Sequence, residues 1–427
     1  MPTSTRPASR SRIALILAFG QAIGRGALAL AMLLLVRELS APAYGQLALA
    51  VAIVAILVAV ADGGFSRLIV RDLARTGDHD TEQIWRVMGV RAVSVVAVTV
   101  LVAALGIASG RAAISYVGLS SAFLVGEALS FGFESAAVGL ERPWRFVAAQ
   151  ATGAVVLLGG VVALVALDAA TLDSVLATLA TASCVRALAH AAIWGLHRRR
   201  PGHEGATRGG DATASELWRA ALPFLALSVM STLQYRFGVV ICYGMRGSAE
   251  TAPYAAAVRV LDIAGVLGAI AFSAVAPVFS RAHQAGGADV WRLWRRYVTL
   301  VALAAAPITA ALALGGRPLA SWLFGQRYAE SAGTDLSLLA PAAGIFILLS
   351  VSSVVLYMDD RVSGLLRLTA LNLVASLALT LSFTALAGHH GTAAAVSLGE
   401  LVSFAGFAFV IARRHRAGPG SPATPRS

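Results

Sequence analysis

The fold is decided by IALILAFGQAIGRGALALAMLLLV, residues 13–36, an apolar stretch with Gln21 and Arg25 near its middle. An apolar run of about twenty residues predicts a transmembrane helix. A guanidinium inside a bilayer is costly, and residues of this kind almost always face a bundle interior or a wet cavity. We therefore expect more than a membrane anchor. The stretch predicts a protein with a positively charged chamber within the membrane.

The composition of the whole chain extends this prediction. Hydrophobic residues make up 58% of the 427 residues and charged residues only 13%, whereas soluble domains carry about 25% charged residues. The apolar residues occur in long blocks and not in the short alternating segments of a membrane β-barrel. No hydrophilic stretch is long enough to fold alone in water. The predicted fold class is an all-α polytopic membrane protein.

Counting the apolar blocks gives the number of membrane spans. Each block has the length of a membrane-crossing helix, which predicts about twelve transmembrane helices. The blocks are residues 13–36, 46–70, 88–109, 114–140, 146–167, 173–196, 220–244, 252–279, 298–315, 334–357, 364–387 and 391–412. The block 334–357 is interrupted by Pro341.

The distribution of arginine predicts the orientation. All 34 basic residues are arginine, and alternate loops divide them unequally. One side holds most of them, while the other holds only Arg37, Arg111, Arg246, Arg317 and Arg327. Cytoplasmic loops carry the excess of basic residues, so both termini are expected in the cytoplasm, with the protein in the cytoplasmic membrane. We attribute the use of arginine without lysine to codon bias, and we expect no nucleic-acid partner despite the net charge of +12.

The most polar internal segment, residues 197–216, lies near the midpoint and has the composition of a flexible linker. It predicts an N-terminal six-helix lobe at 1–196, a C-terminal six-helix lobe at 217–412 and a basic tail at 413–427. The motif around Tyr44 and Arg71 in the first half resembles the one around Tyr254 and Arg281 in the second. Parallel repeats of this kind are typical of transporters, so we expect two pseudo-symmetric lobes around a central cleft.

Three arginines in apolar blocks are the candidate substrate-binding residues: Arg25, Arg236 and Arg259, together with Gln21. They occupy the early helices of the two halves, which a two-lobed transporter places around its cleft. Arginine binds phosphate through two parallel hydrogen bonds, so these residues predict an anionic substrate. The alternative is a set of structural ion pairs, since Asp262 follows Arg259 by one helical turn.

Four acidic residues in apolar blocks are candidates for ion coupling or gating: Glu127, Asp62, Asp262 and Glu400. Intramembrane carboxylates often carry protons or bind cations, although structural pairing is the alternative for each. Glu134 shares a helix face with Glu127 but is expected near the cytoplasmic end, within reach of water. Asp62 precedes Gly63 and Gly64, which favour a hinge.

Enzymatic and metal chemistry are not predicted. The chain has no phosphate loop or nucleophile elbow, so we expect no catalytic residues, no cofactor and no enzymatic activity. Cys184 and Cys242 lie in apolar blocks without metal-ligand spacing. His389 and His390 are expected in a short outer loop without a metal role. Arg186 and His190, one turn apart, are expected to form a polar pair inside one lobe.

At these residues the chain resembles the polysaccharide-biosynthesis branch of the MOP exporter superfamily, the oligosaccharide flippases for O-antigen or exopolysaccharide. The resemblance is carried by Gly20-Gln21, Gly24-Arg25, the loop Leu39 to Gly45, Asp62-Gly63-Gly64 and the arginines from 67 to 75. In the second half it is carried by Tyr235-Arg236, Tyr254 to Arg259 and Ala276 to Arg281.

The resemblance implies a flippase that moves a polyprenyl-diphosphate-linked oligosaccharide to the outer leaflet by alternating access. It implies membrane lipids as neighbours, and a polysaccharide polymerase and glycosyltransferases as partner enzymes. Three alternatives stay open: a MATE-like drug or cation antiporter, a flippase for a lipid-linked peptidoglycan precursor, and a membrane scaffold without transport. The glycan, the coupling ion and the oligomeric state are not predicted.

Overall fold

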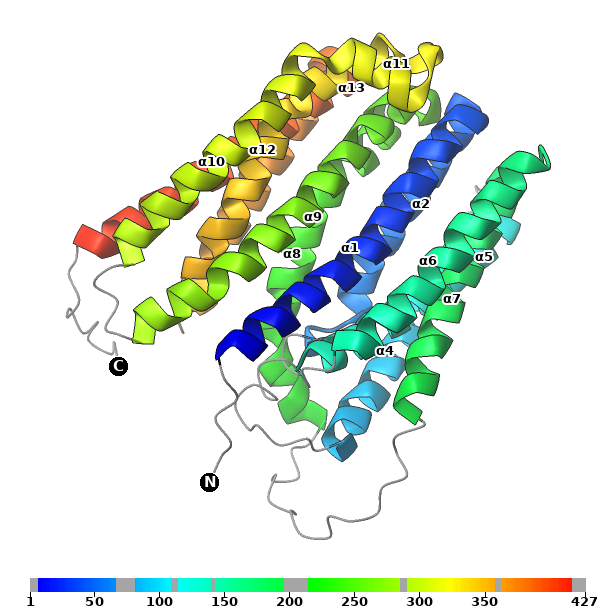
Figure 1. Cartoon of the computed structure of the whole chain (residues 1–427). Helices are drawn as coiled ribbons and strands as arrows, with labels where there is room; N and C mark the ends of the chain where they lie inside the picture. Colours follow the sequence, from blue (N-terminus) through cyan, green and yellow to red (C-terminus); the bar gives the residue numbers. More distant parts are fainter. Residues whose placement is uncertain are drawn as a thin grey trace. The chain divides into compact units, whose positions relative to one another are not determined.

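A computed structural model gives the architecture of the chain. It describes residues 7–66, 81–108, 114–139, 143–195, 214–284, 290–357 and 362–416. Within these ranges the regular structure is helical, and eleven helices are long and apolar enough to cross a membrane. The predicted fold class, an all-α multi-pass membrane protein, is confirmed. Figure 1 shows these helices in sequence colours.

The chain divides into two compact units, each described by itself. The N-terminal unit contains Phe19–Ala252, and the C-terminal unit contains Pro253–Ser427 together with Met1–Ala18. The division follows Ala252, so helix α8 is grouped with the preceding helices. The six-helix lobes expected from the sequence divide the chain earlier and remain a prediction. Most of the predicted linker lies outside the described residues, although its last three residues belong to α8.

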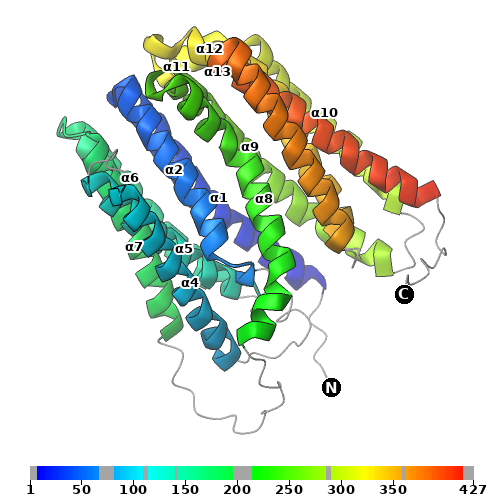
Figure 2. The ribbon, with the colours of Figure 1, turned by 180° about the vertical axis from the view of Figure 1, so that it is seen from behind.

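The helices of the N-terminal unit pack as neighbours along the chain and across it. Helix α7 packs against both α5 and α6, while α2 packs against α8 and α5, and α4 packs against α5. Both ribbon views show α5, α6 and α7 side by side (Figures 1 and 2). The bounds are α1 Pro7–Glu38, α2 Ala41–Ala61, α4 Thr81–Ala108, α5 Ile114–Gly139, α6 Pro143–Ala166, α7 Leu172–Gly195 and α8 Ala214–Arg246. The first part of α1, up to Ala18, is grouped with the C-terminal unit.

Local sequence signals set the ends of α2. The Ser40 hydroxyl accepts a hydrogen bond from the Ala43 N–H at 3.4 Å, which caps the first turn. The helix ends at Asp62, where Gly63 and Gly64 adopt φ of 61° and 79°. Residues with a Cβ rarely adopt this conformation. The two glycines therefore stop the helix well before residue 70, where the apolar block suggested its end.

The C-terminal unit is built around a core shared by four helices. Val275 and Phe279 of α9, Trp294 of α10, Val351 and Val354 of α12, and Ile411 of α13 are buried together. The bounds are α9 Ser248–Gln284, α10 Val290–Leu314, α11 Gly316–Phe324, the 3₁₀ turn η1 Gln326–Tyr328, α12 Ser331–Tyr357 and α13 Val362–Arg416. Short α11 and η1 were not predicted from the apolar blocks.

Two predicted helices, 364–387 and 391–412, are joined in α13. The backbone leaves helical geometry only at Ala387 and at Gly388, which has φ of 60° and ψ of −140°. This bend divides a predominantly apolar segment of 50 residues, longer than one crossing needs, into two helical parts. The expectation of about twelve spans is therefore confirmed, with a bend where a loop was expected.

Pro341 does not interrupt α12, because Ser397 of α13 completes its backbone bonding. Proline removes a backbone donor and displaces the preceding turn. The Ser397 hydroxyl accepts a hydrogen bond from the Ala342 N–H at 3.3 Å and donates one to the Leu338 carbonyl at 2.5 Å. One hydroxyl thus bridges the two groups that would bond directly in an unbroken helix. This contact also joins α12 to α13.

Candidate functional site

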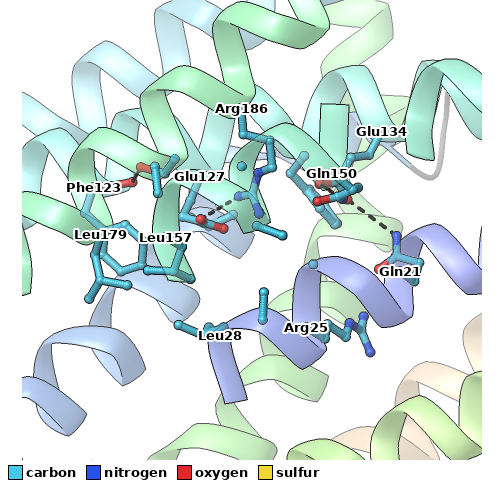
Figure 3. Close-up of a pocket in the computed structure, with 18 residues that line it drawn as sticks. Gln21, Arg25, Leu28, Phe123, Glu127, Glu134, Gln150, Leu157, Leu179 and Arg186 are labelled. Atoms are coloured by element: carbon cyan, nitrogen blue, oxygen red, sulfur yellow. Dashed lines mark hydrogen bonds and ion pairs between the residues drawn. The ribbon is translucent and has the colours of Figure 1, made fainter. Parts of the chain in front are cut away.

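A polar pocket of about 180 Å³ lies inside the N-terminal unit. It is formed by five helices, α1, α2, α5, α6 and α7, and Figure 3 shows the side chains around it. Its polar lining residues are Gln21, Arg25, Glu127, Glu134, Gln150, Ser183 and Arg186. The remaining lining side chains are small or apolar. Polar groups therefore converge from four helices in an otherwise apolar bundle.

Gln21 and Arg25 of α1, two of the residues singled out in the sequence, both line this pocket. They lie one turn apart on the same face of the helix, which is why both reach the pocket. Arg25 is exposed, and no described residue forms a hydrogen bond or an ion pair with it. Figure 3 shows its guanidinium pointing away from the Glu127–Arg186 pair. Arg25 is therefore a pocket cation that is not already paired with a carboxylate among the described residues.

Glu134 is held at the pocket by two amide side chains. Gln150 Nε2 donates to Glu134 Oε1 at 2.7 Å, and Gln21 Nε2 donates to Oε2 at 3.5 Å. The residue is only 9% exposed, so the expectation that water solvates this carboxylate is wrong. The cause is α6, which the sequence could not place and which positions Gln150 over the carboxylate. Buried carboxylates require partners of this kind.

Glu127 pairs with Arg186 across α5 and α7. Arg186 Nη2 lies 2.5 Å from Glu127 Oε1, and the pair lies beside the pocket. Arg186 therefore bonds to Glu127 and not to His190, which lies between Phe133 and Phe146. Since the pocket holds two arginines and two glutamates, its formal charges balance. This pocket therefore differs from the positively charged chamber expected from the sequence.

Two glycines make room for these polar side chains. A Cβ on Gly24 would lie 2.6 Å from Gln150 Oε1, and a Cβ on Gly153 would lie 2.8 Å from the Arg186 side chain. Contacts this short would force the amide or the guanidinium to move. These glycines thus let side chains of a neighbouring helix approach the backbone closely, as glycine commonly does in membrane helix bundles.

Asp62 lies outside this pocket and belongs to a separate buried cluster. Arg91 Nε is 3.2 Å from Asp62 Oδ1, and both side chains are at most 2% exposed. Asp62 also accepts hydrogen bonds from the backbone and the hydroxyl of Ser66, while Arg91 Nη2 donates to the Ala128 carbonyl at 2.5 Å. Arg91 was counted with the basic residues of the cytoplasmic side, but it lies within the membrane-spanning part of α4.

The other predicted site residues lie elsewhere. Arg236 of α8 is half-buried, with its guanidinium carbon 4.8 Å from the Tyr235 ring centroid, and it does not line the pocket. Arg259 of α9 belongs to the C-terminal unit, is fully buried, and bonds to Asp262 at 2.9 Å. Glu400 lies in the second part of α13. A site shared by Arg25, Arg236 and Arg259 therefore remains a prediction.

Sequence reasoning missed Gln150 and Arg91. Gln150 was passed over because an uncharged amide barely interrupts an apolar block, although its position inside the block 146–167 was a signal. Arg91 also lies inside its block, 88–109, and should have been counted with the membrane arginines.

Comparison with known proteins agrees with this architecture. A family model described as "Polysaccharide biosynthesis protein" matches residues 12–283. No curated protein matches the chain by sequence. Solved structures with a similar fold include an inward-facing multidrug resistance MATE family transporter of the MOP superfamily, with a TM-score of 0.73 and 15% identity over 95% of this chain and 98% of that one.

Two further structures share the fold. The lipid II flippase MurJ, in an inward closed conformation, has a TM-score of 0.67 and 9% identity over 93% of this chain and 87% of that chain. A MOP superfamily transporter from Pyrococcus furiosus has a TM-score of 0.64 and 14% identity over 96% of both chains. The family model covers well over half of the sequence. The chain therefore belongs to the polysaccharide biosynthesis protein family and has the fold of MOP superfamily transporters.

Proposed function

We propose that the protein is a flippase that moves a polyprenyl-diphosphate-linked oligosaccharide across the cytoplasmic membrane, for assembly of a polysaccharide or cell-envelope glycan. The proposal makes it a transporter and not an enzyme. Family membership supports a role in polysaccharide biosynthesis. The fold supports transport, because solved proteins with this fold are described as transporters and as a lipid II flippase.

The observation that carries the proposal is Arg25, an exposed guanidinium beside a polar pocket. Arg186 would have to break its bond to Glu127 before it could bind an anionic substrate group. Arg25 can bind such a group without giving up an existing bond, because its donors are not used by described residues. A diphosphate offers the oxygen pairs that a guanidinium binds through two parallel hydrogen bonds. Arg25 is therefore assigned to the diphosphate.

The size of the pocket limits what it holds. Its volume of about 180 Å³ is below the range of roughly 300–1,000 Å³ that is usual for drug-sized ligands. It therefore receives a phosphate or part of one sugar, and not a whole oligosaccharide. Gln21 and Gln150 bring amide groups suited to sugar hydroxyls. The lipid tail would stay in the bilayer while the head group passes through the protein.

Localisation, partners and the remaining site residues belong to the proposal. The arginine distribution supports the cytoplasmic membrane with both termini inside. Arg236 and Arg259 are retained as further anion contacts, although Arg259 must keep or exchange its bond to Asp262. A polymerase and glycosyltransferases are the expected partner enzymes, since they would consume and supply the lipid-linked glycan.

Glu134 favours a second candidate function, cation-coupled or cation-exporting transport of the MATE kind. Its carboxylate is buried and has amide partners, and no arginine forms an ion pair with it among the described residues. Intramembrane carboxylates of this kind bind protons or cations. Glu127, by contrast, is neutralised by Arg186. Glu134 therefore replaces Glu127 as our candidate for the coupling residue.

Export measured together with protein abundance tests the primary function. In cells that make the glycan, Arg25→Ala should abolish export, and lipid-linked glycan should accumulate while protein abundance stays normal. An exposed side chain leaves no buried partner when it is removed. Arg25→Lys should restore export only in part, because an ammonium cannot reproduce the two-pronged contact. The matched control is Arg317→Ala, since the Arg317 side chain is 71% exposed.

Binding by the purified protein separates diphosphate recognition from other defects. Charge-assisted hydrogen bonds contribute about 1.5–3 kcal/mol. Arg25→Ala should therefore weaken binding of a polyprenyl diphosphate by about 10- to 100-fold, with little effect for the control. Equal binding by Arg25→Ala and the native protein would contradict the assignment. Normal glycan export with loss of resistance to a cationic drug would favour the MATE-like function.

A further inference from the structure

A cluster of two histidines and one aspartate lies in the C-terminal unit, far along the chain from the proposed substrate pocket. His389 and His390 follow the bend of α13, and Asp335 lies in the first turns of α12. His389 Nδ1 is 2.8 Å from Asp335 Oδ2, and His390 Nδ1 is 2.7 Å from Asp335 Oδ1. Each carboxylate oxygen therefore faces one imidazole.

The backbone of the bend positions both histidines. Gly388, with φ of 60° and ψ of −140°, adopts a conformation open only to glycine. Next to it, Thr392 Oγ1 donates to the Gly388 carbonyl at 3.2 Å, and Thr384 Oγ1 lies 2.7 Å from Thr392 Oγ1. These bonds connect the two parts of α13 across the bend. The histidines are thus held by the fold and are not on a long free loop.

From this geometry we infer that Asp335, His389 and His390 form a binding site for a divalent transition-metal ion, Zn²⁺ in particular. One ligand atom from each residue lies within 4.8 Å of the others. Imidazole nitrogen and carboxylate oxygen are ligands that Zn²⁺ accepts, and three protein ligands leave a fourth position for water. This inference revises the expectation that His389 and His390 have no metal role.

Burial and access agree with a metal site. The Asp335 side chain is fully buried, whereas His389 is 16% and His390 is 40% exposed. An ion can therefore enter beside His390 and meet a carboxylate that is shielded from water. The arginine distribution predicts that this end of the unit faces away from the cytoplasm, where an ion from outside the cell would reach it.

Binding requires only small changes at the three side chains. Each imidazole must present an unprotonated Nδ1 to the ion. In the Nδ1–H tautomer the proton must move to Nε2, and a neutral histidine keeps its charge. With metal bonds of about 2.0–2.2 Å, tetrahedral ligand atoms stand roughly 3.3 Å apart. The present separations of 2.7–2.8 Å, each to a different oxygen of Asp335, must therefore open by about half an ångström. Ligand atoms that stand farther apart, within the 4.8 Å limit of the cluster, must move closer together. The ion would bridge α12 and the bend of α13.

Metal titration of the full-length protein tests this inference. The protein is purified without a histidine tag, stripped with a chelator, and titrated with Zn²⁺ or Mg²⁺ by calorimetry. We expect one Zn²⁺ per chain, at least tenfold weaker Zn²⁺ binding in Asp335→Asn and in His389→Gln/His390→Gln, and no comparable response to Mg²⁺. His203→Gln is the control, because it removes a histidine of the predicted linker and should keep full binding.

A spectroscopic measurement on the native protein keeps the inference testable if the variants do not fold. Co²⁺ in a tetrahedral site absorbs strongly in the visible range, so the stripped protein should develop this absorption with one equivalent of Co²⁺ and lose it when Zn²⁺ is added. No stoichiometric binding by the native protein, or Zn²⁺ binding lost equally in His203→Gln, would overturn the site. Neither result depends on glycan export, so the flippase proposal is tested separately.

Discussion

The buried pair of Asp62 and Arg91 should be a structural element, and Asp62→Ala tests this. The sequence suggested Asp62 as a gating residue, whereas the structure places it against an arginine that is 1% exposed. Removing the carboxylate leaves the guanidinium buried with the Ala128 carbonyl and the Phe131 ring, whose centroid is 5.7 Å away. Stranding one partner of a buried pair costs about 3–5 kcal/mol.

This loss of unfolding free energy corresponds to a shift in the melting temperature of the protein. For a domain of roughly the size of the N-terminal unit, about 1 kcal/mol shifts the midpoint by 2–4 °C. Asp62→Ala should therefore lower the apparent midpoint of the detergent-purified protein by roughly 6–20 °C. Thermal unfolding followed by size-exclusion chromatography measures this shift. The matched control is Asp173→Ala, which removes an exposed carboxylate and should change stability by no more than about 0.5 kcal/mol.

A double variant tests the physical reason. Asp62→Asn with Arg91→Met removes both charges, and such replacements are often neutral or stabilising, so the double variant should recover most of the lost midpoint. A single Asp62→Ala variant that melts like the native protein but fails to export glycan would refute this reasoning. That result would return Asp62 to the gating role suggested by its sequence.

Three further outcomes follow from the site, the helix packing and the predicted topology. Glu134→Gln keeps an oxygen that can accept a hydrogen bond from Gln150, so protein abundance should stay normal. The dependence of export on the proton or sodium gradient should be lost. An unchanged dependence would show that Glu134 does not couple transport to the gradient. Ser397→Ala removes the hydroxyl beside Pro341 and should lower the unfolding free energy by about 1–3 kcal/mol, measured as a lower midpoint of thermal unfolding. Adding Pro341→Ala should restore the midpoint, because alanine returns a backbone donor. A cysteine at position 209, which lies outside the described residues, should react with an impermeant thiol reagent only in opened cells, and reaction in intact cells would contradict the predicted orientation.

Much of the architecture was readable from the chain because the bilayer constrains it. Water is absent from the membrane core, so the backbone must bond internally and apolar stretches must be helical. The number of spans and the fold class followed from block length alone. The cost of a charge in lipid likewise singles out Arg25 and Glu127 from the sequence alone. The ends of α2 were less accessible, since two glycines stop it inside its apolar block.

Which polar groups meet was decided only by tertiary structure. A sequence shows that Glu127 and Glu134 share a helix face, but their partners lie on three other helices, α1, α6 and α7. Helix packing brings Arg186 to Glu127 and Gln150 to Glu134, while Arg25 stays exposed. It also brought Asp335 to the two histidines of the α13 bend. Hydropathy determines that a helix crosses the membrane, whereas contacts between helices, which depend on shape and rotation about each axis, determine what its buried polar side chains can do.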